Sequence, residues 1–169
     1  MNELSFDRFT KKIYINASIE KLYWCWATED GLTSWFLREA KFTRENFTVD
    51  YGEYTKPGDA YVWKWHNWDG QEEGKVTQAN GKDFLQFTFA DGLVDIHLEQ
   101  VNEVVVVTLK QHQIPTDDDS KLKIHVGCSN GWTFWLTNLK AYLEHGILLN
   151  EKEQDLTTNK LAGWIFVNM

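Results

Sequence analysis

The sequence has only two cysteines, Cys25 and Cys128, and they stand far apart without a CxxC spacing. Two such residues are too few for a disulfide framework or a cysteine-based zinc site, so we expect reduced, buried thiols. The sequence also contains no GxSxG or HExxH motif, no phosphate-binding glycine loop and no dinucleotide fingerprint. These absences argue against the common nucleophile, metal and nucleotide enzymes, and we expect no metal and no cofactor.

Basic residues and long apolar runs are scarce as well. Lys and Arg number 17 against 25 Asp and Glu, which gives a formal net charge of -8. Because phosphate recognition relies on clustered Lys and Arg, neither nucleic acid nor an anionic membrane surface is an expected partner. No stretch reaches about 18 apolar residues, and residues 1–8 lack the apolar run of a signal peptide. We therefore expect no membrane insertion and a cytoplasmic location.

Aromatic residues are what the sequence has in excess. Nine Trp, ten Phe and six Tyr occur among 169 residues. Each large ring adds much apolar surface that must be buried or must face another molecule. The rings therefore fill the core of one domain or line a ligand cavity, and both alternatives remain open.

The spacing of apolar residues predicts an α+β fold. Residues 6–15 alternate as a strand does, whereas residues 16–31 follow helical spacing and stop at Gly31. Leu32, Trp35 and Phe36 indicate a second short helix after that glycine. Turn residues then punctuate six further expected strands, near residues 40–51, 59–68, 72–79, 84–89, 93–101 and 104–113. Together with the first, these strands predict a sheet of about seven.

The C-terminal part is predicted to be helical and then apolar. Pro115 breaks the last strand, and three consecutive Asp residues, 117–119, favour the start of a helix rather than a metal site. A long final helix is expected over residues 129–146, with a start as early as Lys121 and an end at Gly146. Residues 147–169 are too apolar for a free end, so we expect residues 163–167 to dock, as a short strand or against a partner subunit.

Several stretches resemble one family. Residues 15–23 (INASIEKLY) resemble the opening I-x-A-[PS]-x-E-x-[VL]-[WY], and residues 32–36 (LTSWF) resemble L-x-x-W-F. Residues 73–76 (EGKV) resemble a glycine-containing strand, x-G-x-V. Residues 131–146 resemble G-W-x-x-x-L-x-N-L-K-x-Y-L-E-x-G, which is typical of the heat-shock-protein-90 ATPase activator homologues in the START-like, or SRPBCC, superfamily.

The resemblance implies a helix-grip fold in the order β-α-α-β(6)-α, with a curved antiparallel sheet wrapped on the long C-terminal helix. This domain would span residues 1–146, and residues 147–169 would form an apolar tail packed on the same domain or on a partner subunit. The resemblance also implies a hydrophobic cavity between the last helix and the sheet. Other branches of the superfamily hold lipid, sterol or polyketide ligands there.

The first functional hypothesis is non-enzymatic binding of a small apolar ligand in this cavity. Strand alternation places rings on one face of two strands, and the final helix has an apolar stripe that would face them. The candidate cavity residues are Trp35, Tyr61, Trp63, Trp65, Phe87, Phe89, Trp132, Trp135, Leu136 and Leu139. Such large rings would equally fill the cavity themselves.

Two alternatives stay open. One is a protein-interaction module that binds a chaperone, as the resemblance suggests, or a second copy of the chain through the tail. The other is a cavity enzyme of the cyclase or aromatase kind, in which His97 beside Asp95 or Glu99 would act as a base. Because three polar residues at this spacing are more typical of the solvent face of a strand, we assign no catalytic residue.

Overall fold

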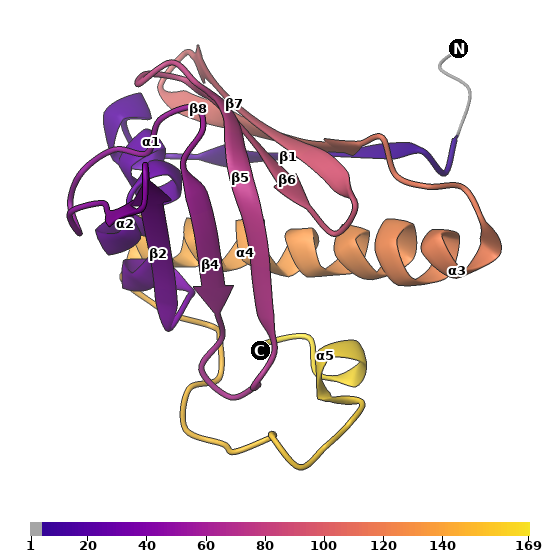
Figure 1. The fold of residues 1–169 in the computed structure, drawn as a ribbon. Helices are drawn as coiled ribbons and strands as arrows, with labels where there is room; N and C mark the ends of the chain where they lie inside the picture. The colour runs from indigo at the N-terminus through magenta and orange to yellow at the C-terminus, as the bar shows by residue number, and fades with distance from the viewer. Residues whose placement is uncertain (1–4) are drawn as a thin grey trace.

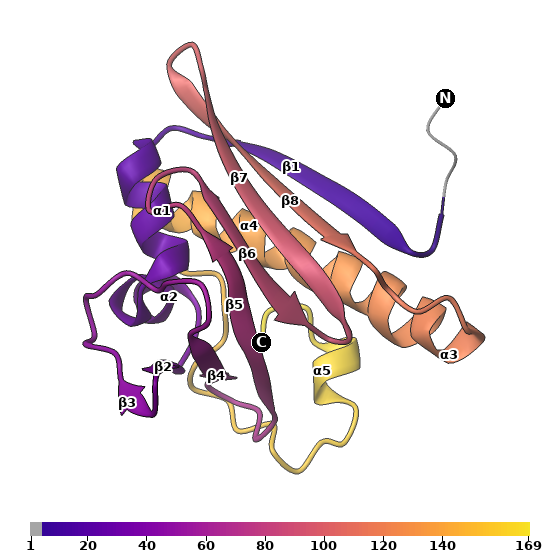
Figure 2. The same ribbon diagram turned by 45° about the horizontal axis from the view of Figure 1, so that its top comes forward.

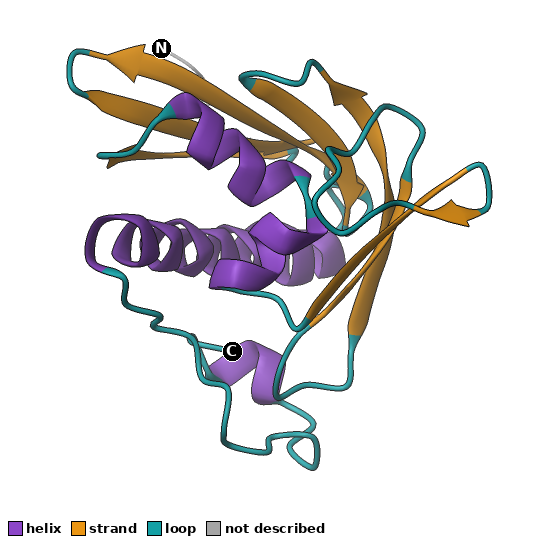
Figure 3. Cartoon of the chain, turned by 90° about the vertical axis from the view of Figure 1, so that its left-hand side faces the viewer, coloured by secondary structure: helices purple, strands orange, loops and turns teal. Residues whose placement is uncertain are grey.

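A long helix lies in the grip of a curved antiparallel sheet in the computed structural model, which describes residues 5–169 (Figure 1). The sheet has eight strands, which lie side by side in the order β1 (Arg8–Ile15), β8 (Val104–His112), β7 (Gly92–Val101), β6 (Phe84–Phe89), β5 (Gln71–Ala79), β4 (Ala60–Lys64), β2 (Glu39–Arg44) and β3 (Phe47–Thr48). Figure 3 shows the longer helices together on the concave side of the strands, with the short helix next to the C-terminus apart from them. This arrangement confirms the predicted helix-grip α+β fold.

The elements follow the predicted order. The strands are β1 Arg8–Ile15, β2 Glu39–Arg44, β3 Phe47–Thr48, β4 Ala60–Lys64, β5 Gln71–Ala79, β6 Phe84–Phe89, β7 Gly92–Val101 and β8 Val104–His112. The helices are α1 Ile19–Ala27, α2 Glu29–Trp35, α3 Asp118–Ser120, the π-helical turn η1 Lys121–Val126, α4 Gly127–His145 and α5 Ala162–Ile165. The extra strand arises because Glu45 and Asn46, with φ of 49° and 70°, turn the chain back within residues 40–51.

The boundary between the first two helices lies earlier than predicted. Thr28 ends α1 and caps α2, because its Oγ1 accepts a hydrogen bond from the Gly31 N–H at 2.8 Å. Gly31 therefore lies inside α2 instead of stopping a helix. A Cβ at this position would lie 2.0 Å from the carbonyl oxygen of Trp24, so glycine permits the close contact of the two helices.

The C-terminal helical segment begins before residue 129, in agreement with the earlier of the two predicted starts. Asp117 caps it by accepting a hydrogen bond from the Ser120 N–H at 3.0 Å, which gives the first of the three Asp residues a structural role. The turns of α3 and η1 lead directly into α4. Gly146 ends α4 with a left-handed φ of 67°, as predicted.

The core lies between α4 and the concave face of the sheet. Figure 2 shows α1 and α2 together near the end of α4 that leads to the tail. Four tryptophans, Trp26, Trp35, Trp63 and Trp132, are at most 2% exposed. No helix within residues 5–169 is both long and apolar enough to cross a membrane.

The tail begins with residues that are held firmly and continues as a loop. Asn150 is buried, and the Glu151 N–H donates to the carbonyl oxygen of Asn168 at 2.6 Å, which brings the two ends of the loop together. The short strand predicted near residues 163–167 is wrong, because residues 162–165 form one turn of helix, α5. The Ile165 N–H donates to the Leu161 carbonyl there, so the local hydrogen bonds close within the turn.

Candidate functional site

The predicted cavity residues come together between α4 and the sheet, and most are buried. The buried ones are Trp35, Tyr61, Trp63, Phe87, Trp132, Trp135, Leu136 and Leu139, and the partly buried ones are Trp65 and Phe89. Neighbouring rings touch: the centroids of Tyr61 and Trp63 lie 4.3 Å apart, and those of Trp132 and Trp135 lie 4.8 Å apart. In this conformation the rings therefore pack on one another.

Trp135 on α4 is the centre of this aromatic cluster. Its ring centroid lies 4.2 Å from that of Phe36 and 4.8 Å from that of Trp132. It also lies 6.1 Å from Trp26 and 5.8 Å from Trp63. Trp26 and Phe36 were not predicted as cavity residues, although the helical spacing of their segments places both on apolar faces.

The indole N–H groups of the cluster are not equally satisfied. Trp35 donates to the carbonyl oxygen of Cys25 at 3.1 Å, and Trp132 donates to Oε1 of Gln111 at 2.8 Å. The Nε1 atoms of Trp26 and Trp63 are buried and meet no acceptor among residues 5–169. A buried donor without an acceptor costs about 1–3 kcal/mol, so these two groups are available to an acceptor that enters the cluster.

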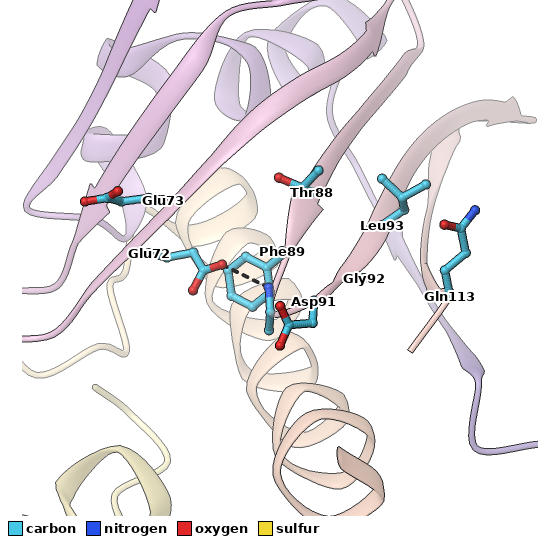
Figure 4. A pocket seen from close by; sticks show the side chains of 9 residues that line it. Glu72, Glu73, Thr88, Phe89, Asp91, Gly92, Leu93 and Gln113 are labelled. Atoms are coloured by element: carbon cyan, nitrogen blue, oxygen red, sulfur yellow. Dashed lines mark hydrogen bonds between the residues drawn. The ribbon is translucent and has the colours of Figure 1, made fainter. Parts of the chain in front are cut away.

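A surface cleft of about 620 Å³ adjoins the cluster (Figure 4). It is lined by Glu72, Glu73, Thr88, Phe89, Ala90, Asp91, Gly92, Leu93 and Gln113. The ring of Phe89 is common to the cleft and the cluster, because its centroid lies 4.8 Å from that of Trp132 and 6.2 Å from that of Trp63. Phe89 thus separates the cleft from the buried rings.

Glu72 supplies the carboxylate that lies near Phe89 in the cleft. Figure 4 shows its side chain directed toward the Phe89–Ala90 backbone, and the Ala90 N–H donates to Glu72 Oε1 at 2.9 Å. Burial raises the pKa of Glu72, and the charges of Asp91 and Glu73 raise it further, while the hydrogen bond from Ala90 opposes them. Glu72 was not predicted as a site residue, although strand alternation places it on the same face of β5 as the buried Val76.

The two cysteines are free thiols, one buried and one partly buried. Burial raises the pKa of Cys25 to about 12 and that of Cys128 to about 11, so both stay protonated near neutral pH. Thiolate chemistry is therefore not favoured at either position. Within residues 5–169, no three His, Cys, Asp or Glu side chains are placed to hold a metal ion together.

The polar residues considered for catalysis lie on the face of β7 that is turned away from α4. His97 and Glu99 are exposed, whereas the alternate residues of the strand are buried. Asp95 contacts His112, at 3.2 Å between Oδ2 and Nε2, and Gln86, whose Nε2 donates to its Oδ1 at 2.7 Å. This polar network forms on the outer face of the sheet, as the alternation of β7 had predicted, and does not face the aromatic cluster.

Comparison with known proteins agrees with this architecture. The family model described as Activator of Hsp90 ATPase homolog 1-like protein matches residues 16–144. None of the curated proteins compared with the chain matches it. Protein SSP2350 from Staphylococcus saprophyticus has a similar structure, with a TM-score of 0.66 at 18% identity over 83% of this chain and 94% of that one.

Two further structures illustrate the range of the fold. The Aha1 dimer from Colwellia psychrerythraea gives a TM-score of 0.64 at 22% identity, over 82% of this chain and 97% of that one. DynU16, a protein from the dynemicin biosynthetic locus, gives 0.64 at 14% identity, over 83% of this chain and 48% of DynU16, so this chain spans about half of its length. The chain therefore belongs to the family of Activator of Hsp90 ATPase homologue 1-like proteins, within the START-like superfamily.

Proposed function

We propose that the protein is a cytoplasmic, non-enzymatic carrier or sensor that binds a small hydrophobic molecule between α4 and the sheet. The ligand class is lipid, sterol or polyketide-like. One observation carries the proposal: a continuous run of touching rings leads from the open cleft into the core through Phe89, Trp132 and Trp135. An apolar molecule that displaces Phe89 would remain in contact with aromatic surface along this path.

The energetics favour such entry for an apolar ligand. Each Å² of apolar surface removed from water stabilises the bound state by roughly 25 cal/mol, which offsets the movement of partly buried rings such as Phe89. Glu72 stands beside the entrance with one oxygen engaged by the Ala90 N–H. It would meet a polar end of the ligand there, while the apolar end lies against the rings.

The proposal is tested by native mass spectrometry of freshly purified protein, followed by organic extraction. A fluorescence screen of fatty acids, sterols and aromatic polyketides then reads the tryptophan emission. We expect a co-purified lipid or a saturable change of emission with micromolar affinity. The proposal would be refuted if the measured mass equalled that of the protein alone and the tryptophan emission showed no saturable response to any of these compounds.

A pair of variants locates the binding site. Phe89→Asp places a charge between the cleft and the cluster, so it should weaken binding at least about tenfold, because an unpaired charge is costly in apolar surroundings. Phe47→Asp is the matched control, since Phe47 is 77% exposed on the short strand β3. Equal loss of binding in both variants would place the ligand elsewhere.

The second candidate is a protein-interaction module that uses the tail. Its support is the exposure of large apolar side chains in that segment, which are Leu161 at 58%, Ile165 at 58%, Phe166 at 41% and Val167 at 78%. Such exposure is common at surfaces that bind other proteins. The related Aha1 protein described as a dimer supports self-association, and the family description supports a chaperone as the other partner.

This candidate is tested separately from ligand binding. Light scattering after gel filtration measures the mass of the protein in solution, and an assay of Hsp90 ATPase measures chaperone activation. The double variant Ile165→Ser with Val167→Ser should abolish either effect while leaving the ligand response intact. A monomer that leaves the ATPase rate unchanged would exclude both forms of this candidate.

A further inference from the structure

We propose that the outer edge of β1 is a docking site for an acidic peptide in extended conformation, which adds a further strand to the sheet. Figure 2 shows β1 as the outermost strand on its side of the sheet. Two observations carry the proposal: backbone hydrogen-bonding groups that point away from the sheet, and a local excess of positive charge. Neither depends on ligand binding in the aromatic cluster.

Half of the residues of β1 direct their backbone groups outward. The strand is the first of the sheet and pairs only with β8, along its whole length. In an antiparallel pair, alternate residues direct N–H and C=O to the neighbouring strand, and the residues between them direct theirs to the other side. The even-numbered residues of β1 form the outward set, because the carbonyl oxygens of Arg8 and Tyr14 accept hydrogen bonds from side chains of the C-terminal helical segment.

These side chains occupy the two ends of the edge and leave its middle free. Nε2 of His125 donates to the first of the two carbonyl oxygens at 3.1 Å, and Nζ of Lys140 donates to the second at 2.7 Å. Thr10 and Lys12 lie between these contacts, and nothing within residues 5–169 bonds to their outward N–H and C=O groups. We call these four groups the open edge. An extended peptide can satisfy such groups by pairing with the strand.

The charge around the open edge defines the chemistry of the peptide. Residues 8–12 (RFTKK) include three cations and no carboxylate, in a chain with a formal net charge of -8. Arg8 lies 3.6 Å from the carboxylate of Asp7, whereas Lys11 and Lys12 form no ion pair in the described part of the chain. Because successive side chains of a strand point to opposite faces, one of these lysines lies on each side of the open edge.

The same charges disfavour a second copy of β1 as the occupant. Two-fold antiparallel pairing centred on Thr10 would place Arg8 opposite Lys12. Pairing centred on Lys11 or on Lys12 would place that lysine opposite its own copy. Like charges directly opposite each other destabilise a sheet, whereas Glu or Asp at these places stabilises it. An acidic segment of another protein is therefore the occupant that the edge fits.

The charge requirement is tested with two heptapeptides, one that alternates Glu with Val and one that alternates Lys with Val. Fluorescence anisotropy of the labelled peptides should show saturable binding of the Glu peptide and at least about tenfold weaker binding of the Lys peptide. Lys12→Glu should weaken binding of the Glu peptide about tenfold. Lys82→Glu is the matched control, since it makes the same charge change at an exposed position in the turn between β5 and β6, and it should change the affinity less than about twofold.

Strand addition is tested at the backbone. Thr10→Pro removes one outward N–H but none that faces β8, so it should weaken the Glu peptide about tenfold, whereas Thr10→Val keeps the N–H and should bind as the wild type does. The wild type provides a measurement that needs no variant to fold. Saturation with the Glu peptide should slow hydrogen exchange at the Thr10 and Lys12 amides at least about tenfold, and change it little at Lys11 and Ile13, whose N–H groups face β8.

Four results would overturn the proposal. The first is the absence of binding of the Glu peptide, and the second is equal affinity for the two peptides. The third is binding that leaves hydrogen exchange at Thr10 and Lys12 unchanged, which would show contact through charge alone. The fourth is slow exchange of both amides in concentrated protein without peptide, which would show that a second copy occupies the edge.

Discussion

Asn138 on α4 joins the helix to the start of the tail, and its replacement by alanine is expected to destabilise the protein strongly. The side chain is fully buried, and its Nδ2 donates to the carbonyl oxygen of Trp35 at 2.7 Å and to Oδ1 of Asn150 at 3.3 Å. Its Oδ1 accepts the Leu149 N–H at 2.7 Å. Asn150 in turn donates to the carbonyl oxygen of Phe36 at 3.2 Å. One amide thus connects the end of α2, α4 and the tail.

The magnitude follows from the groups that would lose their partners. Asn138→Ala leaves the carbonyl oxygen of Trp35 and the N–H of Leu149 without this partner, and an unsatisfied buried group costs about 1–3 kcal/mol. We expect a total loss of about 3–5 kcal/mol, which is a large part of the ~5–15 kcal/mol by which domains are stable.

Urea denaturation measures this loss, and hydrogen exchange at the Leu149 amide shows whether the tail is released. Thr137→Ala is the control, because Thr137 is an exposed neighbour on α4 and, among the residues that the structure describes, its Oγ1 bonds only to the carbonyl oxygen of Thr133. It should change the stability by less than about 0.5 kcal/mol. A loss below about 1 kcal/mol in Asn138→Ala, with unchanged exchange at Leu149, would refute the reasoning.

Three further predictions concern the core and a buried ion pair. Trp132→Ala should lower the free energy of unfolding by about 3–5 kcal/mol, since it removes a buried ring and leaves Gln111 without its indole donor. A loss below about 1 kcal/mol, measured by urea denaturation, would contradict this prediction. Asn67→Leu should raise the melting temperature, because Asn67 is 3% exposed and neither polar atom of its amide has a hydrogen-bond partner in the described chain. A lower melting temperature would show that the amide forms hydrogen bonds in solution. Burial alone would raise the pKa of Asp59, but hydrogen bonds, chiefly from Arg44, bring it below its usual value. The stability that Asp59 contributes is therefore present above about pH 4 and lost as the pH falls further, so Asp59→Asn should flatten the acid limb of a stability–pH curve.

The local elements could be predicted because their signals lie in neighbouring residues. Strand β6 occupies residues 84–89 as predicted, since apolar and polar side chains alternate there between clear turn signals. The turn at Glu45 and Asn46 was missed because neither residue is the glycine that usually marks a left-handed turn. Gly31 was misread for the opposite reason, as its role depends on the carbonyl oxygen of Trp24 in the preceding helix.

Which rings face the interior was largely predictable from the sequence, with Trp26 and Phe36 missed, whereas the packing of these rings on one another was not. Alternation along the strands and the stripe on α4 identified the rings that face the interior, such as Trp63 and Trp132. Whether these rings enclose a space or touch one another depends on the distance between α4 and the sheet, which no local pattern contains. The contact of Trp135 with both Trp26 and Trp63 is a property of three separate elements brought together.

The order of the elements, the helix-grip fold and the aromatic character of the interior follow from the amino-acid sequence alone, because these depend on periodicity, capping and composition. Which buried polar groups are paired, in contrast, depends on the folded structure. Asn138 finds Trp35 and Asn150, while the N–H groups of Trp26 and Trp63 find no acceptor in the described chain. A hydrogen bond requires two groups within about 3 Å, and residues far apart in the sequence reach that distance only through the packing of the whole fold.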